Sequence, residues 1–249
     1  MSDSARRAER LRGFFGLQLK FAERMGEALG LSFSEAAVRY TNLHRRLGLG
    51  RPDRPAPANK WSGYGERLDQ LERSAQRLDF IVEAVGDAPA EAPPEPQIRF
   101  GCFAFEPPDG DGRVRFHFHN ADTEGDVGPL SRTKIDRRRG ELRALFAHLH
   151  EAYPSARTVQ GGSWLYNLAA YRRLFPPIYA ESGTPMERPR LTGSSTWGQL
   201  LRHDDTVNPT VERAFLAGLD RLQPHAPWTV FPMRALSTRA PLEAFMDFY

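Results

Sequence analysis

Apolar residues recur at helical spacing along the first third of the chain. Residues 8–29 carry a broad apolar stripe, with Gly30 as a stop signal, and a capping serine starts a second periodic run over residues 32–47. We expect these two helices to pack as a hairpin. Residues 51–60 contain three prolines and are predicted to be a loop, and a third helix is predicted over residues 68–85.

The spacing changes from helical to alternating after a proline-rich stretch. Residues 98–105 are rich in aromatic side chains, residues 113–119 alternate strictly, and the Pro-Pro-Asp-Gly-Asp-Gly turn between them predicts a β-hairpin. Beyond the hairpin the pattern predicts a helix over residues 136–153, a short strand over 156–160 and a tight turn at 161–162. It then predicts helices over residues 163–174 and 208–222 and a last strand over 228–231.

This change of period predicts two domains. Residues 1–88 form a helical domain, residues 89–97 form a proline-rich linker, and residues 98–249 form a mixed α/β domain. The expected fold class is therefore α+β, with an N-terminal helical subdomain followed by a mixed β-sheet domain.

The amino-acid composition excludes several classes of function for this chain. The 249 residues are 40% hydrophobic and 26% charged, which is typical of a globular protein. The single cysteine, Cys102, excludes an internal disulfide and a cysteine-based zinc or iron–sulfur centre, and we predict no metal site. A net charge of +3 argues against nucleic acid as a partner. No apolar run reaches the roughly 18 residues of a membrane span, so we expect a cytoplasmic protein without a membrane partner.

Alternation along the second hairpin strand separates two kinds of side chain. Val114, Phe116 and Phe118 point to one face, and the opposite face carries basic or titratable residues, namely Arg113, Arg115, His117 and His119. In one interpretation His117 or His119 is a general base and the arginines hold an anionic substrate. In the other, this is the solvated face of an antiparallel sheet.

A second candidate site is the segment Gly161-Gly162-Ser163. If a strand ends before it and a helix begins at Ser163, the free amide groups of the first turn attract a phosphate, and Arg157 or Arg172 adds charge. These residues are the candidate cofactor-binding set. The alternative is a tight turn that serves packing alone.

Four segments of the chain carry a family resemblance: GCFAF, VRFHFHN, GPLSRTKIDRRRGELRALFAHL and GGSWLYNLAAYRRLFPPIY. In this order they resemble the C-terminal part of bacterial acyltransferase-like proteins of the GNAT superfamily, over about residues 98–231. The resemblance implies a mixed sheet with a splayed strand pair that admits acyl-coenzyme A. The chain departs from the usual coenzyme-binding signature, because Gln160 stands where the signature has its first glycine.

The resemblance implies an acyl-coenzyme-A-dependent N-acyltransferase that acts on a small-molecule or peptide amine. A histidine or water removes the amine proton, and Tyr166 or Tyr171 protonates the leaving thiolate. The alternative is a non-catalytic interaction module, with a protein partner on the N-terminal helices, and the incomplete signature favours it. A third interpretation takes residues 29–49 as a helix-turn-helix, against which the modest net charge argues.

Overall fold

The chain folds into two compact units in the computed structural model. Unit 1 comprises Met1–Ala92 with Arg188–Pro232, and unit 2 comprises Pro93–Glu187 with Met233–Tyr249. The described residues are 2–51, 54–55, 58–88, 97–122 and 124–249, so most of the predicted linker, residues 89–96, lies outside them. Helices dominate unit 1 and a mixed sheet organises unit 2, which confirms the predicted α+β class.

Unit 1 is built from helices around a small two-stranded sheet. Its elements are α1 (Asp3–Arg10), α2 (Arg12–Leu29), α3 (Phe33–Tyr40), α4 (Leu43–Arg46), β1 (Gly50–Arg51), β2 (Arg54–Pro55), α5 (Ala58–Gln70), α6 (Ser74–Asp87), α10 (Ser194–Trp197), η3 (Gly198–Leu200), α11 (Pro209–Leu219) and η4 (Pro227–Val230). Gly30 ends α2 in the left-handed conformation, at φ 66°, and Ser32 caps α3 in a capping box with Glu35. The predicted third helix is two helices, and the first of them begins inside the predicted loop.

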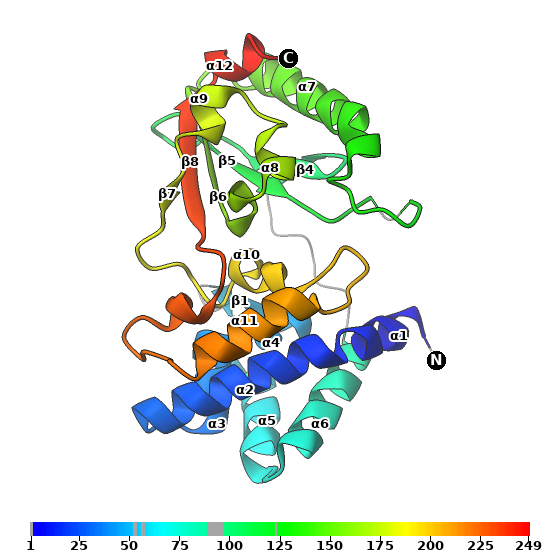
Figure 1. Ribbon diagram of the computed structural model, residues 1–249, viewed down its shortest axis with the longest axis vertical. Coiled ribbons are helices and arrows are strands. Elements are labelled where there is room, and N and C mark those ends of the chain that lie inside the picture. Colours follow the sequence, from blue (N-terminus) through cyan, green and yellow to red (C-terminus); the bar gives the residue numbers. More distant parts are fainter. Residues whose placement is uncertain (1, 52–53, 56–57, 89–96, 123) are drawn as a thin grey trace. The chain divides into compact units, whose positions relative to one another are not determined.

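The core of unit 1 joins segments that are far apart in the sequence. The indole of Trp197 contacts the rings of Phe14 and Phe21 on α2, and Phe21 also packs on Phe215 of α11, which lies alongside α2 in Figure 1. The sequence pattern places residues 188–232 in the second domain. The structure assigns them to unit 1, because their large aromatic side chains are buried against α2.

Unit 2 contains a six-stranded sheet with the order β3-β4-β5-β6-β8-β7. The strands are β3 (Ile98–Phe100), β4 (Phe103–Glu106), β5 (Arg113–Phe118), β6 (Thr158–Ser163), β7 (Thr184–Pro185) and β8 (Leu236–Pro241). Neighbouring strands are antiparallel except for the central pair β5–β6, which is parallel and is connected through the long helix α7 (Ile135–Ala152). The predicted hairpin and the predicted helix after it are both present.

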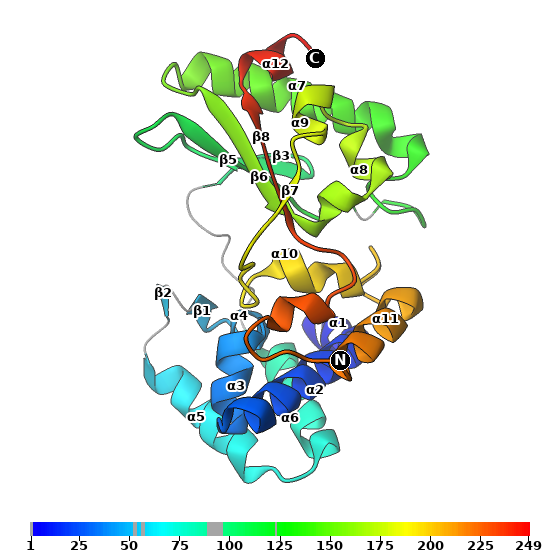
Figure 2. The ribbon, with the colours of Figure 1, turned by 60° about the vertical axis from the view of Figure 1, so that its left-hand side comes forward.

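Helices cover one face of this sheet, as Figure 2 shows for α7, α8 (Ala169–Arg172), α9 (Pro177–Ala180) and α12 (Glu243–Met246). They bury Val114 and Phe116 of β5 in one core with Phe146 of α7. Strand alternation therefore turns the intervening residues of β5 to the opposite face, which we call the open face.

Three predictions for the second half of the chain were wrong. Residues 228–231 form the 3₁₀ turn η4 and not a strand, whereas the strand β8, inserted between β6 and β7, was missed. The turn expected at Gly161-Gly162 is the end of β6. The helix expected over residues 163–174 consists of a 3₁₀ turn, η2 (Trp164–Asn167), and the single turn α8.

Candidate active site at the parting of two strands

His117 on the open face is paired with a carboxylate. Its Nε2 lies 2.8 Å from Oε1 of Glu106, across the hairpin on β4, and the two side chains are about one-third exposed, at 30% and 31%. A carboxylate only accepts hydrogen bonds, so Nε2 of His117 carries the hydrogen and Nδ1 is the basic nitrogen of the neutral ring. This pair is the arrangement of a general base held by an acidic residue.

His119 differs from His117 in its partner and in its titration. Its Nε2 lies 2.9 Å from Oε1 of Gln97. Burial, with smaller effects from Arg99 and His117, lowers the pKa of His119 to about 4. His119 is therefore neutral at pH 7, and its amide partner positions the ring without charging it.

The parallel strands β5 and β6 separate at their carboxyl ends. Their pairing runs from Arg113 opposite Thr158 to Phe116 opposite Gly161 and stops there. Beyond this point β5 continues as His117–Phe118 beside β4, and β6 continues as Gly162–Ser163 beside β8. We call these four residues the strand parting. Along it, the edges that the two strands turn toward each other do not pair with each other.

The predicted phosphate cradle at Gly161, Gly162 and Ser163 is wrong in its geometry. All three residues belong to β6, and the element that follows is a four-residue 3₁₀ turn, so no long helix begins at Ser163. The Ser163 hydroxyl instead accepts a hydrogen bond from the backbone N–H of Leu165. Gly161 faces the core, and Gly162 is exposed at the strand parting.

Tyr166 and Tyr171 lie on the covered side of the sheet, not on the face of His117. They are only 2% and 1% exposed, and the hydroxyls of Tyr166 and Tyr179 are 2.7 Å apart. Burial raises the pKa of both Tyr166 and Tyr171, so both phenols stay protonated. The ring of Tyr171 contacts Phe118 at the strand parting, with centroids 5.5 Å apart.

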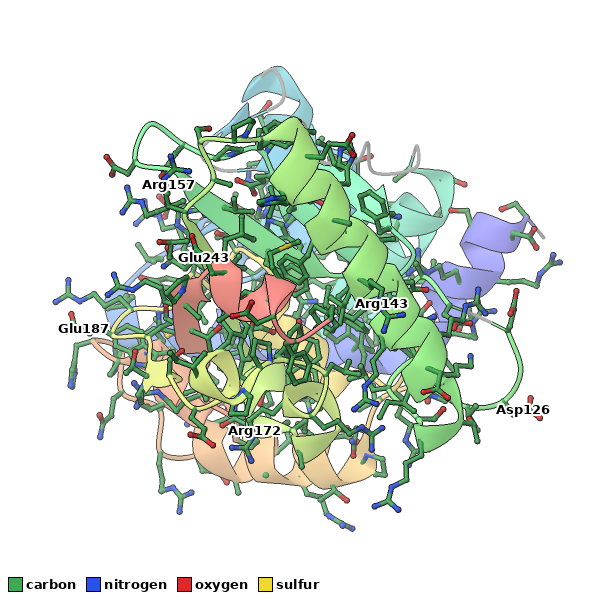
Figure 3. The ribbon with its side chains drawn as sticks, turned by 90° about the horizontal axis from the view of Figure 1, so that it is seen from above. Asp126, Arg143, Arg157, Arg172, Glu187 and Glu243 are labelled. Carbon is green, nitrogen blue, oxygen red and sulfur yellow. The ribbon has the colours of Figure 1, made fainter. Side chains whose placement is uncertain are left out.

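The two arginines of the predicted cofactor site are not near each other. Figure 3 shows Arg157 at the entry to β6 and Arg172 on α8, well separated. The Arg157 guanidinium donates to the carbonyl oxygens of Pro154 and Ala156. At about 3.3 Å per residue, its backbone lies about 16 Å from that of Gly162, so Arg157 does not belong to a site at the strand parting.

A buried ion network holds the segment that leaves β5. Arg138 of α7, 1% exposed, donates from Nη2 to Asp122 Oδ2 and to Glu141 Oε1, each at 2.8 Å. Its Nη1 contacts the Cys102 sulfur, and Lys134 donates to Asp122 Oδ1 at 2.9 Å. The network ties the chain four residues beyond Phe118 to α7 and to the β3–β4 turn. It therefore fixes the path of the chain next to the strand parting.

Sequence reasoning identified His117 but missed Glu106 and this network. Glu106 immediately precedes the Pro-Pro turn, and the hairpin register places it opposite Arg115, diagonal to His117. That register was the signal available. Nothing in the spacing of Asp122 and Arg138 indicated that they meet.

The two glycines of β6 should respond very differently to substitution. A β-carbon at Gly161 would overlap the hydroxyls of Tyr166 and Tyr179, whereas one at Gly162 would meet only Met186 Sδ, at 3.7 Å. We expect Gly161→Ala to lower the free energy of unfolding by about 2 kcal/mol through overpacking. Gly162→Ala should leave it nearly unchanged. Urea denaturation of both variants measures this, and equal losses would contradict the placement of the tyrosines.

Comparisons with known proteins add no identification. No family model matches the chain, and neither a curated protein nor a solved structure matches it.

Among the described residues, no group of three histidine, cysteine or acidic side chains is placed to hold a metal ion. None of the helices in the described ranges has the length and apolar character to cross a membrane.

Proposed function

We propose that the protein is an acyl-coenzyme-A-dependent N-acyltransferase whose reaction takes place at the strand parting. The observation that carries the proposal is the early end of the β5–β6 pairing, at Phe116 and Gly161. It agrees with the splayed strand pair that the resemblance to the GNAT superfamily implies. Acyl-coenzyme A has an arm with amide groups, which can pair with the strand edges that face the parting.

The side chains around the parting support this reaction because a base and an acid lie on its two sides. His117 on the open face accepts the proton of the attacking amine at Nδ1 while Glu106 holds Nε2. On the covered side the hydroxyl of Tyr166 lies against Gly161, the last paired residue of β6, and stays protonated. Tyr166, or Tyr171 behind Phe118, gives its proton to the leaving sulfur. Bound acyl-coenzyme A supplies the thioester.

Calorimetry with coenzyme A and acetyl-coenzyme A tests the proposal. The wild-type protein should bind both, and Gly162→Val should abolish binding, because the branched side chain projects over the open face at the strand parting and obstructs the coenzyme there, while its β-carbon meets only Met186. Gly110→Val is the matched control. Gly110 has no neighbour within 4 Å of its β-carbon position and lies in the turn at the other end of β5.

Two results would overturn the proposal. Absence of coenzyme binding to the wild-type protein would exclude the transferase and favour a non-catalytic interaction module. Equal binding to wild type and Gly162→Val would place the coenzyme away from the strand parting.

A further inference from the structure

A row of polar side chains crosses the open face of the sheet below His117. Arg115 of β5 is in register with Gln160 of β6, and Gln160 is in register with Arg239 of β8. Their chain neighbours Val114, Val159 and Ala240 are buried in the core of unit 2, so the row faces away from the helices. We call Arg115, Gln160 and Arg239 the arginine row.

The two guanidinium groups of the row are only weakly engaged within the described part of the chain. The Arg115 side chain is 69% exposed, and its contact with the Glu106 carboxylate is long, at 3.8 Å. Arg239 is exposed, and among the described residues no carboxylate lies within ion-pair distance of its guanidinium. By contrast, Arg113 on the same face is paired with Asp109 at 3.0 Å and with Asp111 at 2.7 Å. Donors therefore remain available in the row and not at Arg113.

The spacing of the row suits one oxyanion. Adjacent strands lie about 4.8 Å apart, so the backbones of Arg115 and Arg239 are about 10 Å apart with Gln160 between them. Two long guanidinium side chains reach a single group over that span, and the Gln160 amide adds a donor. Besides Arg113, which its two aspartates neutralise, the other charged groups on this face are Glu106, which is held by His117, and Arg99. His119 is neutral at pH 7.

The row is also at a defined distance from the base. His117 follows Arg115 by two residues on the same face, which places the two about 7 Å apart along the strand. We propose that the acceptor substrate is a small amine that also carries an oxyanion, either a carboxylate or a phosphate, which the arginine row binds while the amine lies at His117. This inference rests on the proposed function, because His117 places the amine.

The test compares three amines of similar size: ethanolamine, O-phosphoethanolamine and β-alanine. Acyl transfer from acetyl-coenzyme A to the two anionic amines should show a KM about tenfold higher in Arg115→Gln and in Arg239→Gln than in wild type, because a charge-assisted hydrogen bond is lost. Transfer to ethanolamine, which has no oxyanion for the row to bind, should be affected less than transfer to the two anionic amines in both variants. Arg113→Gln is the control, since Arg113 shares the face but is already paired. The better of the two anionic amines identifies the oxyanion.

Calorimetry with O-phosphoethanolamine and β-alanine in the absence of coenzyme separates this inference from the proposed function. Binding that the row variants abolish and that added salt weakens supports the row, even if coenzyme A does not bind. If coenzyme A binds but neither anionic amine does, or if Arg113→Gln weakens binding as much as the row variants, the inference is overturned and the transferase stands.

Discussion

Replacing Arg138 with methionine should lower the free energy of unfolding by about 3 kcal/mol, because it removes the buried guanidinium that joins Asp122 to Glu141. Arg138 is 1% exposed and Asp122 is 5% exposed, so water does not replace the lost hydrogen bonds. The loss should be at the lower end of the range for a broken buried pair, since Lys134 still binds Asp122. Urea denaturation of wild type and variant measures the difference.

Arg139→Met is the matched control, one residue further along α7. Arg139 is exposed, and its replacement should change the free energy of unfolding by less than about 0.5 kcal/mol. If Arg138→Met were as harmless as Arg139→Met, the buried network would not stabilise the chain beyond β5.

The elements that the sequence predicts well are those whose period is set by one buried face. Strict alternation over β5 identified the covered side of Val114 and Phe116, and with it the common face of His117 and His119. The helix α7 was predicted equally well, because its buried leucines recur every three or four residues. In both cases the local pattern and the tertiary contacts agree.

The failures have a common physical cause, which is that a distant partner decides the outcome. Two consecutive glycines usually mark a turn, but in β6 Gly161 makes room for the hydroxyls of Tyr166 and Tyr179. Strand β8 carries three consecutive polar residues, Ser237, Thr238 and Arg239, and so lacks an alternating pattern, yet it becomes an internal strand because β6 and β7 pair with its two edges. A short stretch of sequence around each segment does not reveal these tertiary partners.

The residues of the candidate site also differ in whether their own segment or a distant partner determines their position. The position of His117 on a strand face follows from its own segment, whereas Glu106 follows from hairpin register, and the strand parting follows only from where the β5–β6 pairing stops. The parting involves two segments separated by the whole of α7. Residue types alone therefore located the base but not the strand parting beside it.

Lowering the pH should destabilise unit 1 through the buried side chain of His44. His44 is 3% exposed, and neither of its ring nitrogens has a hydrogen-bond partner in the described part of the chain. Burial, with a smaller effect from Arg45, lowers the pKa of His44 from 6.5 to about 4. The unfolded chain therefore binds a proton more readily than the folded one between these two values.

The sign and size of the effect follow from this difference. Stability due to neutral His44 is fully present above about pH 6.5, is lost as the pH falls, and is gone below about pH 4, with a total of about 3 kcal/mol. His44→Leu should remove this loss. It should also be at least as stable as wild type at pH 7, because two buried nitrogens without partners are removed.

Urea denaturation at several pH values between 7 and 4 measures the effect as the difference between wild type and His44→Leu. The subtraction cancels the contribution of His119, which has a similarly lowered pKa in unit 2 and is present in both proteins. His225→Gln is the control, since His225 belongs to the same unit but is exposed. Parallel profiles for wild type and His44→Leu would show that His44 takes up its proton without unfolding, and that the imidazole is less buried than its 3% exposure indicates.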